Sequence, residues 1–79
     1  MNKLNILSRI IIDPAVCHGK PVIRGMRYTV SSILELLASG MTHQEILDDF
    51  PDLEEEDLKA CLLFADKLST VKSITQLVA

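Results

Sequence analysis

The fold is decided by the stretch TVSSILELLASGMTHQEILDDFPDL, residues 29–53. Its clearest signal lies in the middle, where Thr42 and Glu45 have the spacing of a capping box. Met41 and Ile46 flank that box at the spacing of a hydrophobic staple, which fixes the direction in which a chain enters a helix. The sequence therefore predicts a helix that begins at Thr42.

A second helix is predicted immediately before this one. Its apolar residues recur at the spacing of one helix face, and they are Val30, Ile33, Leu34 and Leu37. Either Thr29 or Ser32 can cap its N-terminus, and Ser32 and Glu35 have capping-box spacing. Gly40 stands where a left-handed residue commonly follows a helix. These signals predict a helix between Thr29 and Gly40.

A third helix is predicted after Pro51, which disfavours helix at the residue before it and so ends the preceding helix. The helix starts at Asp52–Glu54, and the acids Glu54–Asp57 occupy a first turn where the helix dipole favours negative charge. We expect a buried stripe of Leu58, Cys61, Leu62, Ala65 and Leu68. Leu63 and Phe64 fall outside this stripe, so we expect N-terminal strands, a second copy or a partner to cover them.

Residues 9–30 predict short strands and turns. The extended pieces are Ile10–Ile12, Val22-Ile23 and Arg27–Val30. Asp13-Pro14 stops the first piece, and Arg24-Gly25 predicts a tight turn after the second. Residues 1–8 are left open, since their apolar side chains either extend the first strand or swap to a neighbouring molecule.

Length and composition limit what the chain can be. It has 79 residues, of which 48% are hydrophobic and 24% charged, with a net charge of −3. This composition is too apolar for a disordered chain, and the length excludes a multi-domain enzyme with its own cofactor cleft. A core of this size is marginal alone, so we expect a partner or a homodimer to stabilise it.

The sequence also predicts a cytoplasmic protein. Residues 1–7 carry neither the long apolar run nor the cleavage site of a signal peptide. Apolar runs elsewhere are far too short to cross a membrane. The two cysteines, Cys17 and Cys61, do not make a disulfide framework, and we expect reduced thiols.

These signals together predict a mainly α protein: a three-helix helix-turn-helix bundle with a small N-terminal β element and a C-terminal helical tail. The N-terminal β and turn segment covers residues 1–30, the three-helix core residues 31–68, and the tail residues 69–79. We expect all three segments to form one domain.

No catalytic, metal or cofactor site is predicted. Cys17-His18 places two metal ligands side by side with no second pair nearby, which does not build a zinc site. Gly19-Lys20 lacks the first glycine and the Ser/Thr of a phosphate-binding loop, and Pro21 removes a donor N–H. No pair of groups is placed for acid–base chemistry. We therefore expect a non-enzymatic protein.

One combination of residues resembles a known family. Asp13-Pro14 is followed by GKPVIRG at residues 19–25, then by Arg27–Val30, Gly40–Thr42 and Pro51–Leu53. This pattern closely resembles the bacterial family catalogued as domain of unknown function 433, over about residues 9–68. The Gly-x-Pro-x-x-x-Gly-x-Arg spacing is the distinctive part. The sequence departs from the family at Met26, where Thr is usual, and at Glu54, where the helix cap is usually Thr or Ser.

The resemblance implies a fold and a function. The fold is a homeodomain-like helix-turn-helix with a small N-terminal β element. The function is that of a VapB-type antitoxin in a type II toxin–antitoxin pair, and the usual partner is a small PIN-like nuclease encoded by the adjacent gene.

The residues expected to bind a toxin or a second copy are apolar. They are Leu63, Phe64, Val71, Ile74, Leu77 and Val78. The tail residues recur at near-helical spacing and are apolar enough to fill a groove on a partner. They suit equally a C-terminal helix packed on its own domain or across a homodimer.

Three basic residues, Lys20, Arg24 and Arg27, carry a second hypothesis. They could contact DNA phosphates, and Arg24 could engage the acidic metal-binding residues of a nuclease toxin. The alternative interpretation is structural: Arg27 pairs with a helix carboxylate and holds the β element on the bundle, while the other two are solvated.

A DNA-binding regulator or autorepressor is the alternative function. Residues 1–30 are basic overall and residues 31–79 acidic overall, so a basic N-terminal segment could face DNA. The acidic start of the third helix opposes this function, because phosphates carry the same charge sign. A third hypothesis is an orphaned module that only dimerises.

Overall fold

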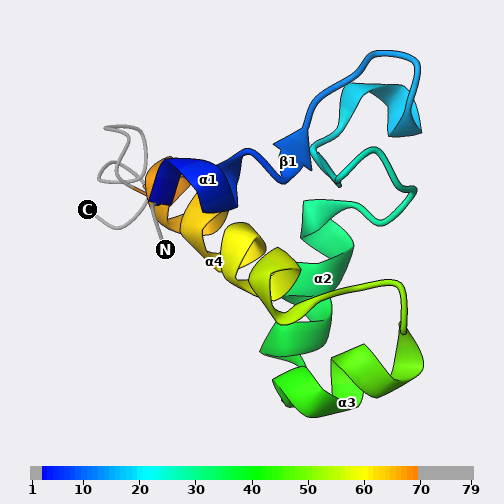
Figure 1. Ribbon diagram of the computed structural model, residues 1–79, viewed down its shortest axis with the longest axis vertical. Helices are drawn as coiled ribbons and strands as arrows, with labels where there is room; N and C mark the ends of the chain where they lie inside the picture. Colours follow the sequence, from blue (N-terminus) through cyan, green and yellow to red (C-terminus); the bar gives the residue numbers. More distant parts are fainter. Residues whose placement is uncertain (1–2, 70–79) are drawn as a thin grey trace.

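The structure is a computed structural model that describes residues 3–69, and these residues form a mainly helical fold (Figure 1). The elements in chain order are α1 (Lys3–Leu7), β1 (Ile10–Ile11), the 3-10 turn η1 (Cys17–Gly19), β2 (Val22–Ile23), α2 (Val30–Ala38), α3 (His43–Asp49) and α4 (Glu55–Ser69). The predicted helical class with a small N-terminal β element is confirmed. The helix-turn-helix assignment and the division at residues 30 and 68 stay predictions.

The β element is an antiparallel pair of very short strands. In β1 and β2, Ile10 lies opposite Ile23 and Ile11 opposite Val22. The third extended piece, predicted at Arg27–Val30, contributes only one bridge, between Val22 and Thr29. Strands this short need other contacts for stability, and β2 has them, since both of its residues are fully buried.

The chain before β1 is helical, so the option of an extended first strand is wrong. Residues 3–7 form α1, which packs against α4 (Figure 1). The Arg9 N–H donates to the Ile6 carbonyl at 3.1 Å, and the Ser8 hydroxyl donates to the Asn5 carbonyl at 2.6 Å. These bonds close a turn that redirects the chain from α1 into β1.

Helix α2 is capped by Thr29, one turn before Ser32, the other predicted cap. Thr29 is the cap, and its hydroxyl accepts a hydrogen bond from the Ser32 N–H at 3.1 Å. The predicted box of Ser32 and Glu35 is therefore wrong, because Ser32 lies within the first turn and its own N–H is the group that needs capping. The helix is followed by Gly40 at a φ of +102°, as the sequence predicts.

Helix α3 follows the sequence signals closely. The Thr42 hydroxyl accepts from the Glu45 N–H at 3.1 Å, and the Glu45 carboxylate accepts from the Thr42 N–H at 2.8 Å. The predicted capping box is confirmed. The helix ends at Asp49, and Phe50 is already non-helical before Pro51.

Helix α4 buries a different side from the one predicted. Leu58 and Cys61 are fully buried as expected, but Leu62 is 44% and Leu68 55% exposed, so these two assignments are wrong. The buried side also includes Asp57 and Ala60, and Phe64 packs against the core. Relative to the prediction, the helix is therefore rotated so that Asp57 faces the core. A search for apolar residues at helical spacing does not find this acid.

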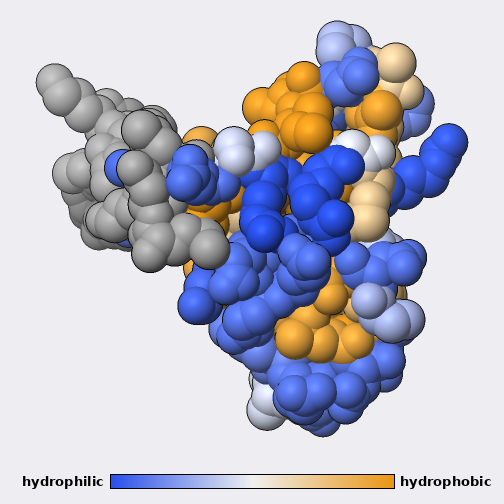
Figure 2. Space-filling model, in the orientation of Figure 1, coloured by the Kyte–Doolittle hydropathy of each residue, from blue (hydrophilic) through white to orange (hydrophobic). Residues whose placement is uncertain are grey.

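The core lies where α2, α3 and α4 meet the buried strand β2. Its buried members are Ile23, Val30, Ile33, Ile46, Leu53, Leu58 and Cys61. A hydrophilic band crosses the face of the molecule seen in Figure 2, and apolar surface appears on both sides of this band. Within residues 3–69, no helix is long and apolar enough to cross a membrane.

Candidate functional site

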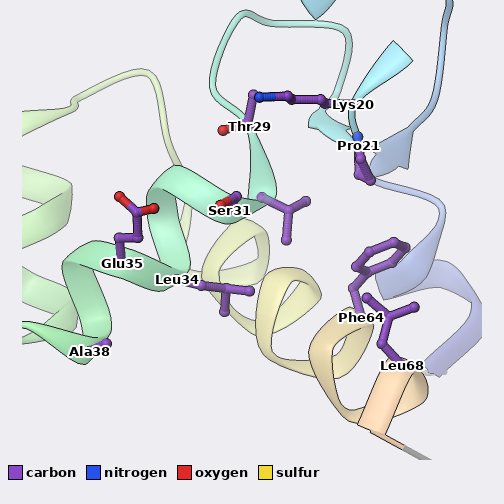
Figure 3. Close-up of a pocket in the computed structure, with 10 residues that line it drawn as sticks. Lys20, Pro21, Thr29, Ser31, Leu34, Glu35, Ala38, Phe64 and Leu68 are labelled. Atoms are coloured by element: carbon purple, nitrogen blue, oxygen red, sulfur yellow. The ribbon is translucent and has the colours of Figure 1, made fainter. Parts of the chain in front are cut away.

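An apolar groove lies between α2 and the second half of α4, beside the segment that enters β2 (Figure 3). Its volume is about 510 Å³. The lining residues are Lys20, Pro21, Thr29, Val30, Ser31, Leu34, Glu35, Ala38, Phe64 and Leu68. The groove is open and mostly apolar, as binding sites for side chains of a partner commonly are.

Two helices supply the apolar walls of the groove. Leu34 and Ala38 stand four residues apart on α2, and Phe64 and Leu68 do so on α4, so each pair shares a helix face. Leu68 is 55% exposed. Covering it fully would contribute about 1 kcal/mol to binding. The groove thus offers a preformed surface for apolar side chains.

The ends of the groove carry opposite charges. Lys20 and Pro21 lie at one end, and Glu35 and Ala38 at the other (Figure 3). Both charged side chains belong to exposed residues, so they contribute little to affinity by themselves. Charges placed at two ends can fix the direction in which a partner segment lies.

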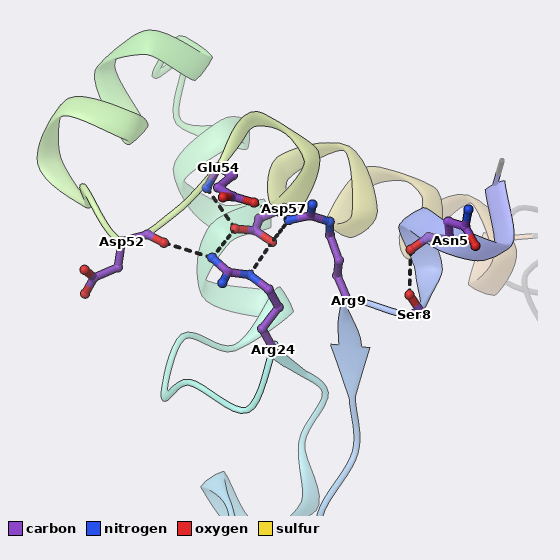
Figure 4. A network of polar contacts seen from close by, with 7 residues as sticks. All are labelled: Asn5, Ser8, Arg9, Arg24, Asp52, Glu54 and Asp57. Carbon is purple, nitrogen blue, oxygen red and sulfur yellow. Dashed lines mark hydrogen bonds and ion pairs between the residues drawn. The ribbon is translucent and has the colours of Figure 1, made fainter. Parts of the chain in front are cut away.

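An ion-pair network around the buried Asp57 adjoins the first turn of α4 (Figure 4). Arg24 donates to both carboxylate oxygens of Asp57, from Nε at 3.0 Å and from Nη2 at 2.9 Å. Its Nη2 also donates to the Asp52 carbonyl at 2.9 Å. The two-pronged contact with Asp57 fixes the direction of the guanidinium, because both nitrogens must stay in the plane of the carboxylate.

The turn after β2 aims Arg24 at α4. Arg24 and Gly25 both have positive φ, 48° and 75°, and the Met26 N–H donates to the Ile23 carbonyl at 2.8 Å. Two successive residues with positive φ make the tight turn of a hairpin, and glycine adopts this conformation at little cost. Arg24 is held in it by its bonds to α4.

Arg9 completes the network from β1's side. Its Nη1 donates to Glu54 at 2.7 Å and to Asp57 at 3.0 Å. Asp57 also accepts from the Glu54 N–H at 2.8 Å, which caps one of the open N–H groups at the start of α4. Asp57 has no exposed surface, whereas the Arg9 and Arg24 side chains are 24% and 36% exposed.

The surroundings of Asp57 keep it ionised. Burial alone raises the pKa of a carboxyl group, but hydrogen bonds from Arg24, from the Glu54 N–H and from Arg9 outweigh burial here. The pKa of Asp57 is therefore lowered. The network fastens the β element to α4 through a charged group that has all of its hydrogen-bond partners.

The network corrects two predictions about basic residues. The structural role assigned to Arg27, pairing with a helix carboxylate, belongs to Arg24 and Arg9 instead. The guanidinium of Arg24 is consequently not free in solvent but bound to Asp57, although 36% of the side chain stays exposed. Arg27 and Lys20 make no ion pair among residues 3–69, and both are exposed.

The groove brings together some of the predicted partner-binding residues. Phe64 lines it, whereas Leu63 is half-buried elsewhere on α4. Val71, Ile74, Leu77 and Val78 lie outside the described residues. Sequence reasoning missed Leu34 and Leu68 as groove residues because it assigned both to buried faces. It also missed Asp57, whose spacing of four residues from Cys61 places it on the buried side of α4.

Other reactive groups do not gather into a site in the described part of the chain. Among residues 3–69, no three His, Cys, Asp or Glu side chains form a group that could hold a metal ion. Burial, helped by the nearby Asp57 charge, raises the pKa of the Cys61 thiol to about 12, so the thiol is protonated at neutral pH. Cys17 is free and half-buried.

The chain is similar to a known protein family and to a solved structure. The family model described as "Protein of unknown function (DUF433)" matches residues 10–65. The crystal structure of a DUF433 member protein from Anabaena variabilis is 31% identical, with a TM-score of 0.71. That match covers 81% of this chain and 67% of the other chain. No curated protein matches. The matched segment includes the motif that carries the sequence resemblance.

Proposed function

We propose that this chain, which belongs to the DUF433 family of proteins of unknown function, is a cytoplasmic antitoxin that neutralises a PIN-like nuclease by direct binding. It acts without catalysis of its own. The partner is the product of the adjacent gene, and binding hides the surface that the nuclease needs for its activity.

The apolar groove between α2 and α4 is the observation that carries this proposal. It presents Leu34, Phe64 and Leu68 to solvent in one preformed depression. An amphipathic helix of the nuclease can place its apolar side chains there, as helices do in grooves of other binding proteins. Lys20 at one end then meets an acidic residue of that helix, and Glu35 at the other end meets a basic one.

The ion-pair network argues against a direct role of Arg24 in the toxin's active site. Arg24 would have to leave Asp57, and the buried carboxylate would then lose its strongest partner. Lys20 is the basic residue that remains exposed beside the groove. We therefore assign the inhibitory contact to the groove and Lys20, and a structural role to Arg24.

Leu68→Asp tests the groove. Leu68 is 55% exposed, so the substitution leaves the fold intact but places a charge where the toxin's apolar side chains bind. We expect at least roughly a tenfold loss of affinity, measured by co-purification with the tagged chain and by rescue of growth when the toxin is expressed. Leu62→Asp is the matched control, because Leu62 is 44% exposed on the same helix and lies outside the groove lining.

These variants distinguish binding of the toxin by the groove from binding by the C-terminal tail. If Leu68→Asp binds and rescues as well as Leu62→Asp does, the groove does not bind the toxin. A Leu77→Asp, Val78→Asp double variant tests the tail by the same two assays. If the unmodified chain forms no complex with the adjacent gene product, the antitoxin proposal itself is wrong.

DNA binding is the alternative, and the start of α4 opposes it. In a helix-turn-helix protein the recognition helix brings its N-terminal residues to the bases. Here that end carries Glu54–Asp57, and Arg9 and Arg24 cover it from the β element. A filter-binding titration with the upstream promoter at several salt concentrations tests this alternative. Tight binding that weakens steeply with salt would favour the DNA-binding regulator.

A further inference from the structure

The outer edge of β1 has no partner strand within the described residues. The sheet contains β1 and β2 only, with β2 bridged on its far side to Thr29. Next to this edge the surface is apolar, since Ile11 is 40% and Ile12 62% exposed. Figure 2 shows apolar surface on the side of the hydrophilic band where β1 lies in Figure 1. Unpaired strand edges recruit other strands unless something blocks them.

Backbone hydrogen bonds define which groups this edge offers. The Arg24 N–H donates to the Arg9 carbonyl, and the Ile23 N–H turns away to the Tyr28 carbonyl. Antiparallel pairs alternate between bonded and non-bonded positions, so Arg9 and Ile11 point their backbone groups toward β2. The N–H and C=O groups of Ile10 and Ile12 therefore point to the free edge.

The sequence around β1 is complementary to itself. It reads Arg9-Ile10-Ile11-Ile12-Asp13, a base and an acid on either side of three isoleucines. In an antiparallel pair centred on Ile11, Ile10 lies opposite Ile12 of the second copy, and Arg9 lies opposite its Asp13. The same register brings the outward-pointing N–H and C=O groups of Ile10 and Ile12 together as bonded pairs. A parallel pair in register would place like charges opposite each other.

Arg9 and Asp13 each have hydrogen-bonding atoms left for a contact with the second copy. Arg9 uses only Nη1 for Glu54 and Asp57, so within the described residues its Nε and Nη2 have no acceptor. Asp13 accepts from the Ala15 N–H through Oδ1 at 2.9 Å, which leaves Oδ2 available. Arg9 can thus hold α4 within its own chain and Asp13 of the second copy.

We propose that two copies of this chain pair through their β1 edges, antiparallel and centred on Ile11, to form a four-stranded sheet across a two-fold axis. The interface is isologous, because each copy contributes the same strand. It shares no residue with the groove lining, so this dimer does not depend on the antitoxin function. Pro14 limits the paired segment to about five residues, so the dimer is weak and forms at high protein concentration.

Cysteine cross-linking tests the register. Ile11→Cys in a Cys17→Ser background places two thiols opposite each other at a non-bonded position, where Cα atoms are about 4.5 Å apart and a disulfide can form. Cys61 stays in place because it is fully buried. Under mild oxidation we expect the Ile11→Cys chain to form linked dimers at least roughly tenfold faster than the matched Ile12→Cys and Leu62→Cys chains.

Sedimentation of the full-length chain tests the dimer without cross-linking. We expect the mass to rise from monomer toward dimer between roughly 10 µM and 1 mM, and Ile12→Pro to remove the rise by deleting an edge N–H. Circular dichroism verifies that the Ile12→Pro chain is folded. A chain that stays monomeric, or a dimer that Ile12→Pro leaves intact, overturns the proposal. Equal cross-linking rates at Ile11→Cys and Leu62→Cys overturn it as well.

Discussion

Asp57 is the residue on which the junction between the β element and the helices depends. It is fully buried and accepts hydrogen bonds from Arg9, from Arg24 and from the Glu54 N–H. A buried carboxylate is costly to leave without partners, and here its two arginine partners come from the β element, which must meet α4 for the fold to form. Asp57 is therefore the fully buried structural residue in the stretch of acids at residues 54–57, and Glu54 joins the same network through Arg9.

Asp57→Asn should destabilise the protein. The amide keeps the shape of the carboxylate but loses its charge, so two arginines remain beside a neutral group. Because both guanidinium groups are partly exposed, we expect the free energy of unfolding to fall by about 2–3 kcal/mol, slightly less than the loss of a partner costs in a fully buried pair. Urea denaturation measures this change. Asp66→Asn, on an exposed residue of α4, is the control and should change stability by less than about 0.5 kcal/mol.

The pH dependence of stability should contain a contribution from Asp57. Its pKa is lowered in the folded state, so the ionised carboxylate favours folding. This contribution is complete above the ordinary aspartate pKa of about 3.9 and is lost as pH falls through the lower pKa of the folded state. The stability difference between the wild-type chain and Asp57→Asn should be constant near neutral pH and shrink below about pH 4. A difference that grows on acidification would contradict this assignment.

Individual elements differ in how well the sequence predicts them. The boundaries of α3 depend on two local signals, the Thr42–Glu45 capping box and Pro51. These two signals are enough to predict where the helix begins and ends. For α1 there was no such signal, because a five-residue helix is stabilised by its packing on α4. The rotation of α4 could not be predicted from apolar spacing, because its buried side includes the charged residue Asp57 as well as Leu58 and Cys61.

The capping box of α3 should contribute measurably to stability. Thr42→Ala removes the hydroxyl that accepts from the Glu45 N–H and leaves this donor without its partner. We expect the free energy of unfolding to fall by about 1 kcal/mol in a denaturant titration. Ser31→Ala is a suitable control, because Ser31 is exposed in the first turn of α2, next to the cap rather than in it. Equal losses in the two variants would mean that the Thr42 cap has no special role.

At the scale of the whole molecule, binding surfaces arise where elements meet. The groove needs α2 and α4 side by side and Lys20 brought over from the segment before β2. No local sequence signal predicts that these three segments lie together. The sequence therefore identified Phe64 as a partner-binding residue, but it did not predict the groove that Phe64 lines. The family could be predicted from a linear motif, because its glycines and prolines mark turns that local sequence determines.

The groove and the strand edge give the molecule separate surfaces for two kinds of contact. In the proposed function the groove between the helices binds an apolar helix of the nuclease, and in the proposed dimer the β1 edge binds a second copy. The two surfaces share no residue, so the two proposed contacts use different side chains. The proposed complex is therefore a weak dimer of the chain that carries one nuclease on each copy.

Amide hydrogen–deuterium exchange of the chain, alone and bound to the product of the adjacent gene, tests the central claim most directly. Groove binding predicts slower exchange in α2, Val30–Ala38, and in the last part of α4 from Phe64 onward. The acidic first turn of α4 should change little. Slower exchange confined to that turn or to β1, with α2 unaffected, would contradict the claim that the groove is where the nuclease binds.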